Sequence, residues 1–305
     1  MYFSVAGIEV SPLVPPLVAF GVSFFASMGG ISGAFLLLPF QMSVLGYTNP
    51  SVSATNQFYN VVAIPSGVYR YIREGRMVWP LSIAVAAGTL PGVFIGALAR
   101  VMWLPDPRSF KLFAAFVLLY IGGKLVRDLL KARKQAGPRG IINRDAVKGG
   151  AKDFSVRVTE KTMRRIAYTF EGEEHSCPTM GIVAMSFIVG IVGGTYGIGG
   201  GAIIAPFFVS WFRLPVHTIS GATLMGTFLT SIAGVAFYSM IAPFFPEQSV
   251  SPDWALGLLF GVGGMAGMYL GARCQKFVPA VIIKWALGAV IVGTALKYIA
   301  EYVFA

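Results

Sequence analysis

The sequence predicts an all-α integral membrane protein of two inverted repeats, each a glycine-broken helical hairpin plus three transmembrane helices. Three observations support this fold class: recurring apolar segments, glycine motifs shared by the two halves, and the placement of lysine and arginine. Of 305 residues, 55% are hydrophobic and 12% are charged, and the mean hydropathy is +0.70. Soluble domains carry about 25% charged residues, so this composition argues against a soluble fold.

Eight apolar segments follow one another, most of them near the roughly 20 residues that a membrane-spanning helix needs. They cover residues 13–45, 53–72, 77–99, 108–126, 180–212, 219–243, 253–273 and 281–303. None alternates apolar and polar residues as the strands of an outer-membrane barrel do. The start, MYFSVAGIEVSPLVPP, has no basic region of the kind found in a cleavable signal peptide. We therefore expect a multi-pass protein of a bacterial or archaeal inner membrane.

A polar segment divides the apolar segments four and four, which gives three regions. Residues 1–126 form the first membrane repeat, 127–178 a cytoplasmic polar insert, and 179–305 the second membrane repeat. Of the 24 basic residues, 12 lie between 127 and 165, and others flank apolar segments. Lysine and arginine mark the cytoplasmic side of membrane proteins in this way, so the net charge of +11 does not indicate a nucleic-acid partner.

Within the insert, DFSVRVTEKTMRRIAYTF alternates well enough to predict a short strand pair. His175, with Glu173, Glu174 and Cys177, has the residue types of a metal site, but a solvated polar patch is the better interpretation. The two cysteines have no C-x-x-C spacing. We expect no metal and no other cofactor.

The two halves carry the same motifs in the same order. Residues 26–40, ASMGGISGAFLLLPF, align without a gap with residues 193–207, GGTYGIGGGAIIAPF. A G-x-x-x-G-x-x-x-G ridge follows in each half, at Gly88, Gly92 and Gly96 and at Gly263, Gly267 and Gly271. Lys111 and Lys124 have the same spacing as Lys284 and Lys297. These correspondences indicate an internal repeat, and the ridges are expected to be helix-packing faces.

The first and fifth segments are too long for one simple span and are interrupted by glycine at Gly29–Gly33 and Thr195–Gly201. Each is predicted to be a broken helix or a hairpin that returns to its own side. Hairpins reconcile the basic links after segments two, four and seven with the acidic link after segment six, and they give the repeats opposite orientations. Both termini then lie outside, and Arg100, Arg108 and Lys111 on the outside are exceptions to the charge rule.

The segment centres contain no Asp or Glu, which cation transporters and proton pumps usually require. Backbone dipoles, hydroxyls and amides remain, and these suit an anion. A half-helix that starts inside a membrane offers unpaired N–H groups and a positive dipole end, at Ser32–Ala34 and Gly199–Gly201. Polar clusters after each hairpin supply further donors, with Thr55 taken as the counterpart of Thr223. The candidate substrate-binding residues are Ser32, Gly33, Ala34, Thr55, Asn56, Gln57, Gly199, Gly200, Gly201, Thr223 and Thr227.

Two alternatives compete with this interpretation. The glycines can serve tight turning alone, and the polar side chains can serve helix–helix hydrogen bonding. GISG at Gly30–Gly33 also matches the G-x-S-G of rhomboid-type intramembrane serine proteases, but the repeat has Gly199 in place of Ser32. We expect a transport protein and no enzyme.

The repeated G-x-G-G turn, followed by a proline and then an Ala/Gly-Thr cluster, resembles the TauE/SafE family of anion permeases. GIGGGAIIAP at 197–206 matches best, whereas the first half has Ser32 in place of a glycine and SATNQF in place of Thr-Ser. The resemblance covers both apolar halves but not the insert. It implies a permease for sulfite, an organosulfonate or a related sulfur oxyanion. A carboxylate or a neutral sulfur compound is the alternative substrate. Expected partners are the small anion, the lipid bilayer and possible further copies of the chain.

Overall fold

The computed structural model describes residues 1–28, 32–140, 156–274 and 280–304. Its helices are α1 (Val14–Met28), α2 (Ala34–Ser43), α3 (Ser51–Ala63), α4 (Pro65–Arg73), α5 (Trp79–Met102), α6 (Pro107–Gly140), α7 (Thr179–Tyr196), α8 (Gly201–Ser210), α9 (Val216–Ile241), α10 (Trp254–Cys274) and α11 (Ala280–Phe304). Within these described residues, five stretches are long and apolar enough to cross a membrane: Trp79–Met102, Pro107–Arg127, Thr179–Tyr196, Thr218–Phe244 and Trp254–Gly271. The all-α membrane fold class is confirmed.

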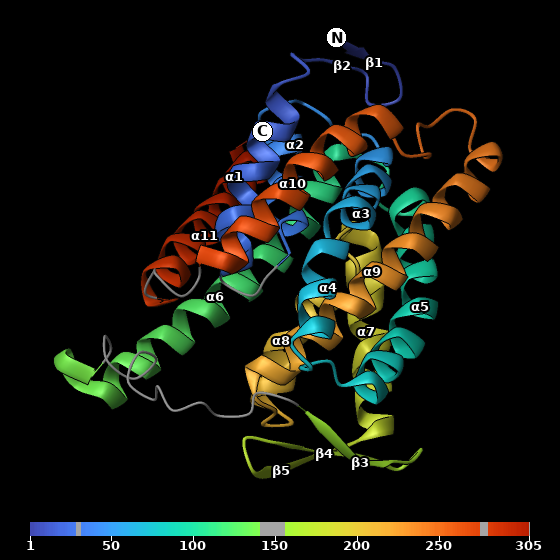
Figure 1. Ribbon diagram of the computed structural model, residues 1–305. Coiled ribbons are helices and arrows are strands. Elements are labelled where there is room, and N and C mark those ends of the chain that lie inside the picture. The colour runs from blue at the N-terminus through green and yellow to red at the C-terminus, as the bar shows by residue number, and fades with distance from the viewer. Residues whose placement is uncertain (29–31, 141–155, 275–279, 305) are drawn as a thin grey trace.

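The helix bundle has two ends. The N-terminal face holds both chain termini, the strands β1 (Tyr2–Phe3) and β2 (Ile8–Glu9), and loops 44–50, 103–106 and 245–253 (Figure 1). The sheet face holds loop 74–78, loop 211–215 and a sheet of β3 (Arg157–Lys161), β4 (Arg165–Phe170) and β5 (Glu173–Pro178). Hydrogen bonds link the parts within each face, as from Asn49 Nδ2 to Val5 O (3.2 Å) and from Val156 N to Gly75 O (2.9 Å).

The two long apolar segments are hairpins. After α2 the chain returns to the N-terminal face, where α1 began. The hydrogen bond from Asn49 to Val5 O at this face shows the return. After α8 it returns to the sheet face, where α7 began, since a Cβ at Gly181 would lie 3.3 Å from the Phe212 ring. The first hairpin therefore starts at the N-terminal face and the second at the sheet face. Part of the first break, residues 29–31, lies outside the described residues.

Each hairpin packs against the ridge helix of the other half. α1 lies along α10, and α7 lies along α5. A Cβ at Gly92 would lie 2.9 Å from Ile191 N, and one at Gly267 would lie 2.9 Å from the carbonyl carbon of Phe20. At this distance a side chain displaces the backbone, so only glycine lets the helices touch. The prediction that both glycine ridges are packing faces is confirmed.

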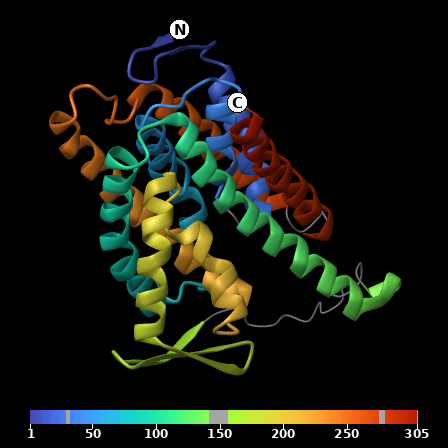
Figure 2. The ribbon, with the colours of Figure 1, turned by 180° about the vertical axis from the view of Figure 1, so that it is seen from behind.

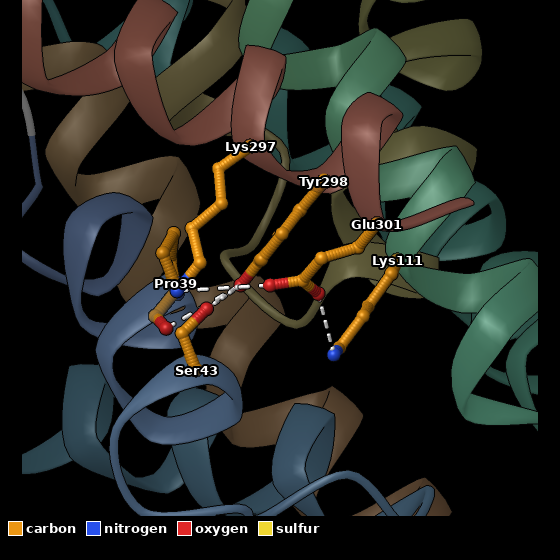
Figure 3. A network of polar contacts seen from close by, with 6 residues as sticks. All are labelled: Pro39, Ser43, Lys111, Lys297, Tyr298 and Glu301. Carbon is orange, nitrogen blue, oxygen red and sulfur yellow. Dashed lines mark hydrogen bonds and ion pairs between the residues drawn. The ribbon is translucent and has the colours of Figure 1, made fainter. Parts of the chain in front are cut away.

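α6 and α11 form a separate pair on one flank, green and red when seen from behind (Figure 2). A polar network ties this pair to α2 near the N-terminal face (Figure 3). Tyr298 Oη donates to Pro39 O (3.3 Å) and accepts from Ser43 Oγ (3.1 Å). Lys111 Nζ lies 2.8 Å from Glu301 Oε2, so one of the three basic residues expected outside has a carboxylate partner.

The other two exceptions to the charge rule are also held by local contacts. Arg100 is fully buried and donates to the carbonyls of Thr48 (3.1 Å) and Leu104, with its guanidinium 3.8 Å from the Phe110 ring centroid. Arg108 donates to Tyr302 O, 2.9 Å away. A cation at the end of a helix satisfies terminal carbonyl groups, and this fold-specific role explains the basic residues on the N-terminal face.

Two elements differ from the sequence prediction. Segment 53–72 was predicted as one helix, but it divides into α3 and α4 because Pro65 has no N–H to bond the preceding turn. The predicted strand pair of the insert forms as β3 and β4, and β5 is a third strand that the alternation did not indicate. The sheet docks on the bundle through Tyr168 Oη, 2.7 Å from Thr218 Oγ1.

Candidate functional site

The second hairpin breaks at a glycine turn. α7 ends at Tyr196, and Gly197 (φ +85°) and Gly199 (φ +70°) adopt the left-handed conformation that other residues rarely take. A Cβ at Gly197 would also lie 2.5 Å from Ser53 Cα, so the turn lies directly on α3. The glycine run therefore sets both the backbone direction and the close approach of this turn to α3.

α8 begins immediately after the turn with its N-cap at Gly200, a residue that has no side chain to cap the helix. The first amides of such a helix have no partner within the helix, and they carry the positive end of its dipole. A Cβ at Gly201 would overlap the Thr223 carbonyl oxygen and Thr227 Oγ1, which places the start of α8 directly against α9. This helix start has the chemistry of an anion site.

The first hairpin restarts in the same way at Gly33, the N-cap of α2. Ser32 Oγ accepts a hydrogen bond from Ala34 N (3.4 Å) and donates to Asn60 Oδ1 (3.0 Å). Gly33 leaves no room for a side chain, because its Cβ would lie 2.6 Å from Ser23 Oγ. This helix start is therefore partly satisfied by a neighbouring hydroxyl.

Two asparagines of α3 join the breaks. Asn56 Nδ2 donates to Ala34 O (3.0 Å) in the first hairpin and to Gly197 O (3.1 Å) in the second. Asn60 Nδ2 donates to Ile198 O (3.0 Å), while its Oδ1 accepts from Ser32. Both side chains are fully buried. The restarts of the two hairpins, far apart in sequence, thus meet over one face of α3.

The repeat correspondence at the site differs from the predicted one. The offset that aligns Gly33 with Gly200 also aligns Asn56 with Thr223. The contacts agree, because Asn56 bonds the first residue of α2 and the Thr223 carbonyl faces the first residue of α8. Asn56, and not Thr55, therefore occupies the place of Thr223. Asn60 and Thr227 correspond in the same way.

Thr55 lies away from the breaks, toward the N-terminal face. Its Oγ1 is 2.7 Å from Tyr47 Oη and accepts a hydrogen bond from Asp253 N at 2.9 Å. Because these contacts join α3 to the loop before α10, the geometry favours the packing alternative for this threonine.

Gln57 is fully buried, and neither Nε2 nor Oε1 has a hydrogen-bond partner. A Cβ at Gly234 of α9 would overlap Gln57 Oε1, so this glycine makes room for the carboxamide. Gly234 is one helical turn from Ser231, whose Oγ accepts from Asn60 Nδ2 at 3.3 Å. Gln57 thus lies beside the bridging asparagines, at the interface of α3 and α9.

The site is enclosed and uncharged in this structure. Ser32, Asn56, Gln57, Asn60 and Thr227 are at most 1% exposed. The fully or nearly buried charged residues of the described part are Arg100 and Asp253. Both make their bonds at the N-terminal face, to Thr48 O and from Ala6 N. A ligand at the breaks would therefore meet amides, hydroxyls and backbone dipoles.

Sequence reasoning missed Asn60 and Ser231. Extending the gap-free alignment of the hairpins into the following helices would have singled out Asn60, because it aligns with Thr227. Ser231 could only be found from the packing of α9 on α3. On α3, Ser53, Asn56, Gln57 and Asn60 have the i, i+3, i+4, i+7 spacing of one helix face.

Two alternative sites find no support in the described residues. No group of three or more His, Cys, Asp or Glu there is arranged to hold a metal ion. Cys177, in the patch considered for a metal, is buried, and His175 packs on the Tyr168 ring at 5.7 Å between centroids. Ser32 donates to an amide oxygen, which cannot take up a proton as the base of a serine protease does.

Comparison with known proteins gives a consistent result. The family model described as sulfite exporter TauE/SafE matches residues 16–298. YunE of Bacillus subtilis (strain 168), a probable membrane transporter protein, is 24% identical over 281 residues, 89% of this chain and 92% of that protein. A probable membrane transporter protein of Xylella fastidiosa (strain 9a5c) is 23% identical over 288 residues, 91% of each chain.

The probable membrane transporter protein YdhB of Bacillus subtilis (strain 168) is 28% identical over 104 residues, and the match spans 39% of its length. No solved structure gives a significant match. The family match covers both helical halves, both hairpin breaks and the segment between them. The chain therefore belongs to the TauE/SafE family of membrane transporters.

Proposed function

We propose that this protein is a permease for a small anion, namely sulfite, an organosulfonate or a related sulfur oxyanion, and that the anion binds where the two hairpin breaks meet. The description of the family as sulfite exporters supports the sulfur oxyanion. Residues 1–126 and 179–305 act as inverted membrane repeats in a bacterial or archaeal inner membrane. The insert 127–178 faces the cytoplasm, and the termini face outward.

One observation carries the proposal: the fully buried asparagines 56 and 60 hold the carbonyls of the turn from which α8 starts, and none of the described side chains bonded there is charged. Backbone amides at a helix start favour a negative charge, and their effect grows where water is absent. Half-helices that meet between repeats near the membrane midplane are a recurring transporter site. The opposite starting faces of α1 and α7 support inverted repeats.

The enclosed site supports alternating access, in which one group of helices moves against the other. The packing divides the described helices into hairpin–ridge pairs, α1 with α10 and α5 with α7, and the pair of α6 and α11. We expect the hairpin–ridge pairs to move as units, because their backbones interlock at glycine.

Uptake into proteoliposomes tests this proposal. Labelled sulfite, a sulfonate, thiosulfate and a carboxylate are compared side by side with empty liposomes. Sulfur anions should accumulate, and the Gly200→Val protein should not transport them, because a Cβ there would overlap Thr89 of α5 and displace the start of α8. Uptake of the carboxylate alone, or of a neutral sulfur compound alone, would contradict the proposal that the substrate is a sulfur oxyanion.

A further inference from the structure

Three unpaired polar atoms belong to two consecutive residues of α3. Among the described residues, nine buried side-chain N or O atoms have no hydrogen-bond partner, and Asn56 Oδ1, Gln57 Nε2 and Gln57 Oε1 are three of them. The orientation of Asn56 is determined, because its other amide atom lies against two carbonyl oxygens and must be the donating nitrogen. Its free atom is therefore a hydrogen-bond acceptor.

Unpaired polar atoms in a protein interior are rare, and each one is unfavourable for folding. Asn56 is bonded to both breaks, and Gln57 lies against α9 one helical turn from the Asn60–Ser231 bond, so these unpaired atoms suit a ligand at the breaks. Asn56 Oδ1 can only accept a hydrogen bond, whereas the first amides of α8, which follow a glycine cap, can only donate. The ligand that satisfies both must accept at one atom and donate at another.

The surroundings also limit the charge of the ligand. Among the described residues, the side chains bonded to the two breaks are asparagines 56 and 60 and serines 32 and 53, and none of these is charged. A buried dianion needs cationic partners, and the buried guanidinium of Arg100 is committed at the N-terminal face. Amides and a helix dipole are matched to a single negative charge.

We propose that the site selects a monoanion that still carries a hydrogen-bond donor, such as hydrogensulfite or a hydroxy- or amino-substituted sulfonate, and that Gln57 helps to determine this specificity. The inference rests on the proposed function and deepens it. The anionic oxygens face the α8 amides, and the O–H or N–H of the ligand donates to Asn56 Oδ1. Gln57, with both a donor and an acceptor free, bonds the same ligand from the α9 side.

A matched ligand pair tests the specificity. Hydroxyethanesulfonate and propanesulfonate have the same charge and nearly the same shape, and they differ by one hydroxyl. Their competition with labelled sulfite is measured in proteoliposomes holding the full chain, beside the dianion sulfate. The hydroxylated sulfonate should compete at least about tenfold better, the effect of one hydrogen bond to a buried acceptor. Sulfate should compete least.

The outcomes separate the inference from the function. Equal competition by the two sulfonates would overturn the inference and leave a sulfur-anion permease. Stronger competition by sulfate than by the sulfonates would overturn the proposal that the site selects a monoanion. If neither sulfite nor any sulfonate is taken up or competes, the proposed function fails and the inference with it.

A variant pair tests Gln57 itself. Gln57→Met removes a carboxamide without breaking any hydrogen bond of the structure, so the melting temperature should stay the same or rise. The preference for the hydroxylated sulfonate should fall several-fold. Gln41→Met is the matched control, because Gln41 of α2 is also fully buried with both carboxamide atoms unpaired. A wild-type preference in Gln57→Met, or an equal loss in both variants, would overturn the role of Gln57.

Discussion

The side-chain amide of Asn60 donates to the backbone carbonyl of Ile198 across 3.0 Å, although the two residues belong to different halves of the chain. The same side chain accepts a hydrogen bond from Ser32 of the first hairpin. One residue of α3 thus holds the restarts of both hairpins. The relative position of the two helix starts depends on these bonds, so their loss should affect both stability and transport.

Asn60→Leu should lower the free energy of unfolding by about 1–3 kcal/mol, because Ile198 O and Ser32 Oγ lose their buried partner. It should also abolish uptake. Thermal unfolding in detergent and proteoliposome uptake measure the two effects. Asn49→Leu is the control, since Asn49 bonds two carbonyls at the N-terminal face and its loss should spare transport. Equal transport defects in both variants would contradict a local role for Asn60.

Gly199→Ala should abolish transport, because the left-handed backbone disfavours a side chain by about 1–2 kcal/mol and the new Cβ would lie 2.9 Å from Thr227 Cγ2. Gly46→Ala is the matched control. Gly46 has nearly the same φ, +69°, but open space around it. Both variants should lose similar backbone stability, and only Gly199→Ala should stop uptake. Normal uptake by Gly199→Ala would show that the break tolerates displacement.

Thr227→Val should weaken substrate binding by about 1–3 kcal/mol, since its hydroxyl lies at the start of α8 and the variant keeps the shape of the side chain. Thr55→Val should instead lower thermal stability and leave KM unchanged, because Thr55 bonds Tyr47 and the amide of Asp253. Concentration dependence of uptake and melting curves separate the two. A larger KM in Thr55→Val than in Thr227→Val would reverse this assignment.

Gly92→Leu and Gly267→Leu should each destabilise the fold by about 1–3 kcal/mol or more, because a side chain at either ridge pushes into the backbone of the other half. Gly123→Leu on α6 should be nearly neutral, since Gly123 is exposed and nothing lies near its Cβ position. Melting temperatures of the three variants are compared. A neutral Gly92→Leu would mean that α5 and α7 do not pack at this ridge.

Single cysteines test the orientation. Glu247→Cys at the N-terminal face should react with an impermeant thiol reagent from outside intact cells, and Met163→Cys in the β3–β4 turn only after lysis. Burial raises the pKa of the Cys177 thiol to about 11, so it stays protonated and unreactive at neutral pH. Cys274 is partly exposed and is replaced by serine first. Labelling of Met163→Cys from outside intact cells would contradict the proposed orientation and place the sheet face outside.

The local order of the molecule follows from the sequence alone. Apolar length predicts the membrane helices, and the glycine runs predict the two hairpin breaks, because glycine acts on the backbone at its own position. The division of segment 53–72 at Pro65 was not predicted. The repeat of Gly30–Gly33 at Gly197–Gly200 and the two glycine ridges can be recognised directly in the amino-acid sequence. Glycine permits the left-handed backbone of the turn at 197–199, and its lack of a Cβ permits the close helix packing at the ridges.

Only the tertiary structure decided which side chains meet. Thr55 and Asn56 are neighbours in a polar cluster, yet one bonds the N-terminal face and the other bonds both breaks. The rotation of α3 about its axis decides this, and α9, α10 and the two hairpins that pack around α3 determine that rotation. For the same reason Asn60 bonds Ile198 and Ser231 of the other half as well as Ser32 of its own half. A side chain's type belongs to the sequence, but its partner depends on helices that no nearby residue specifies.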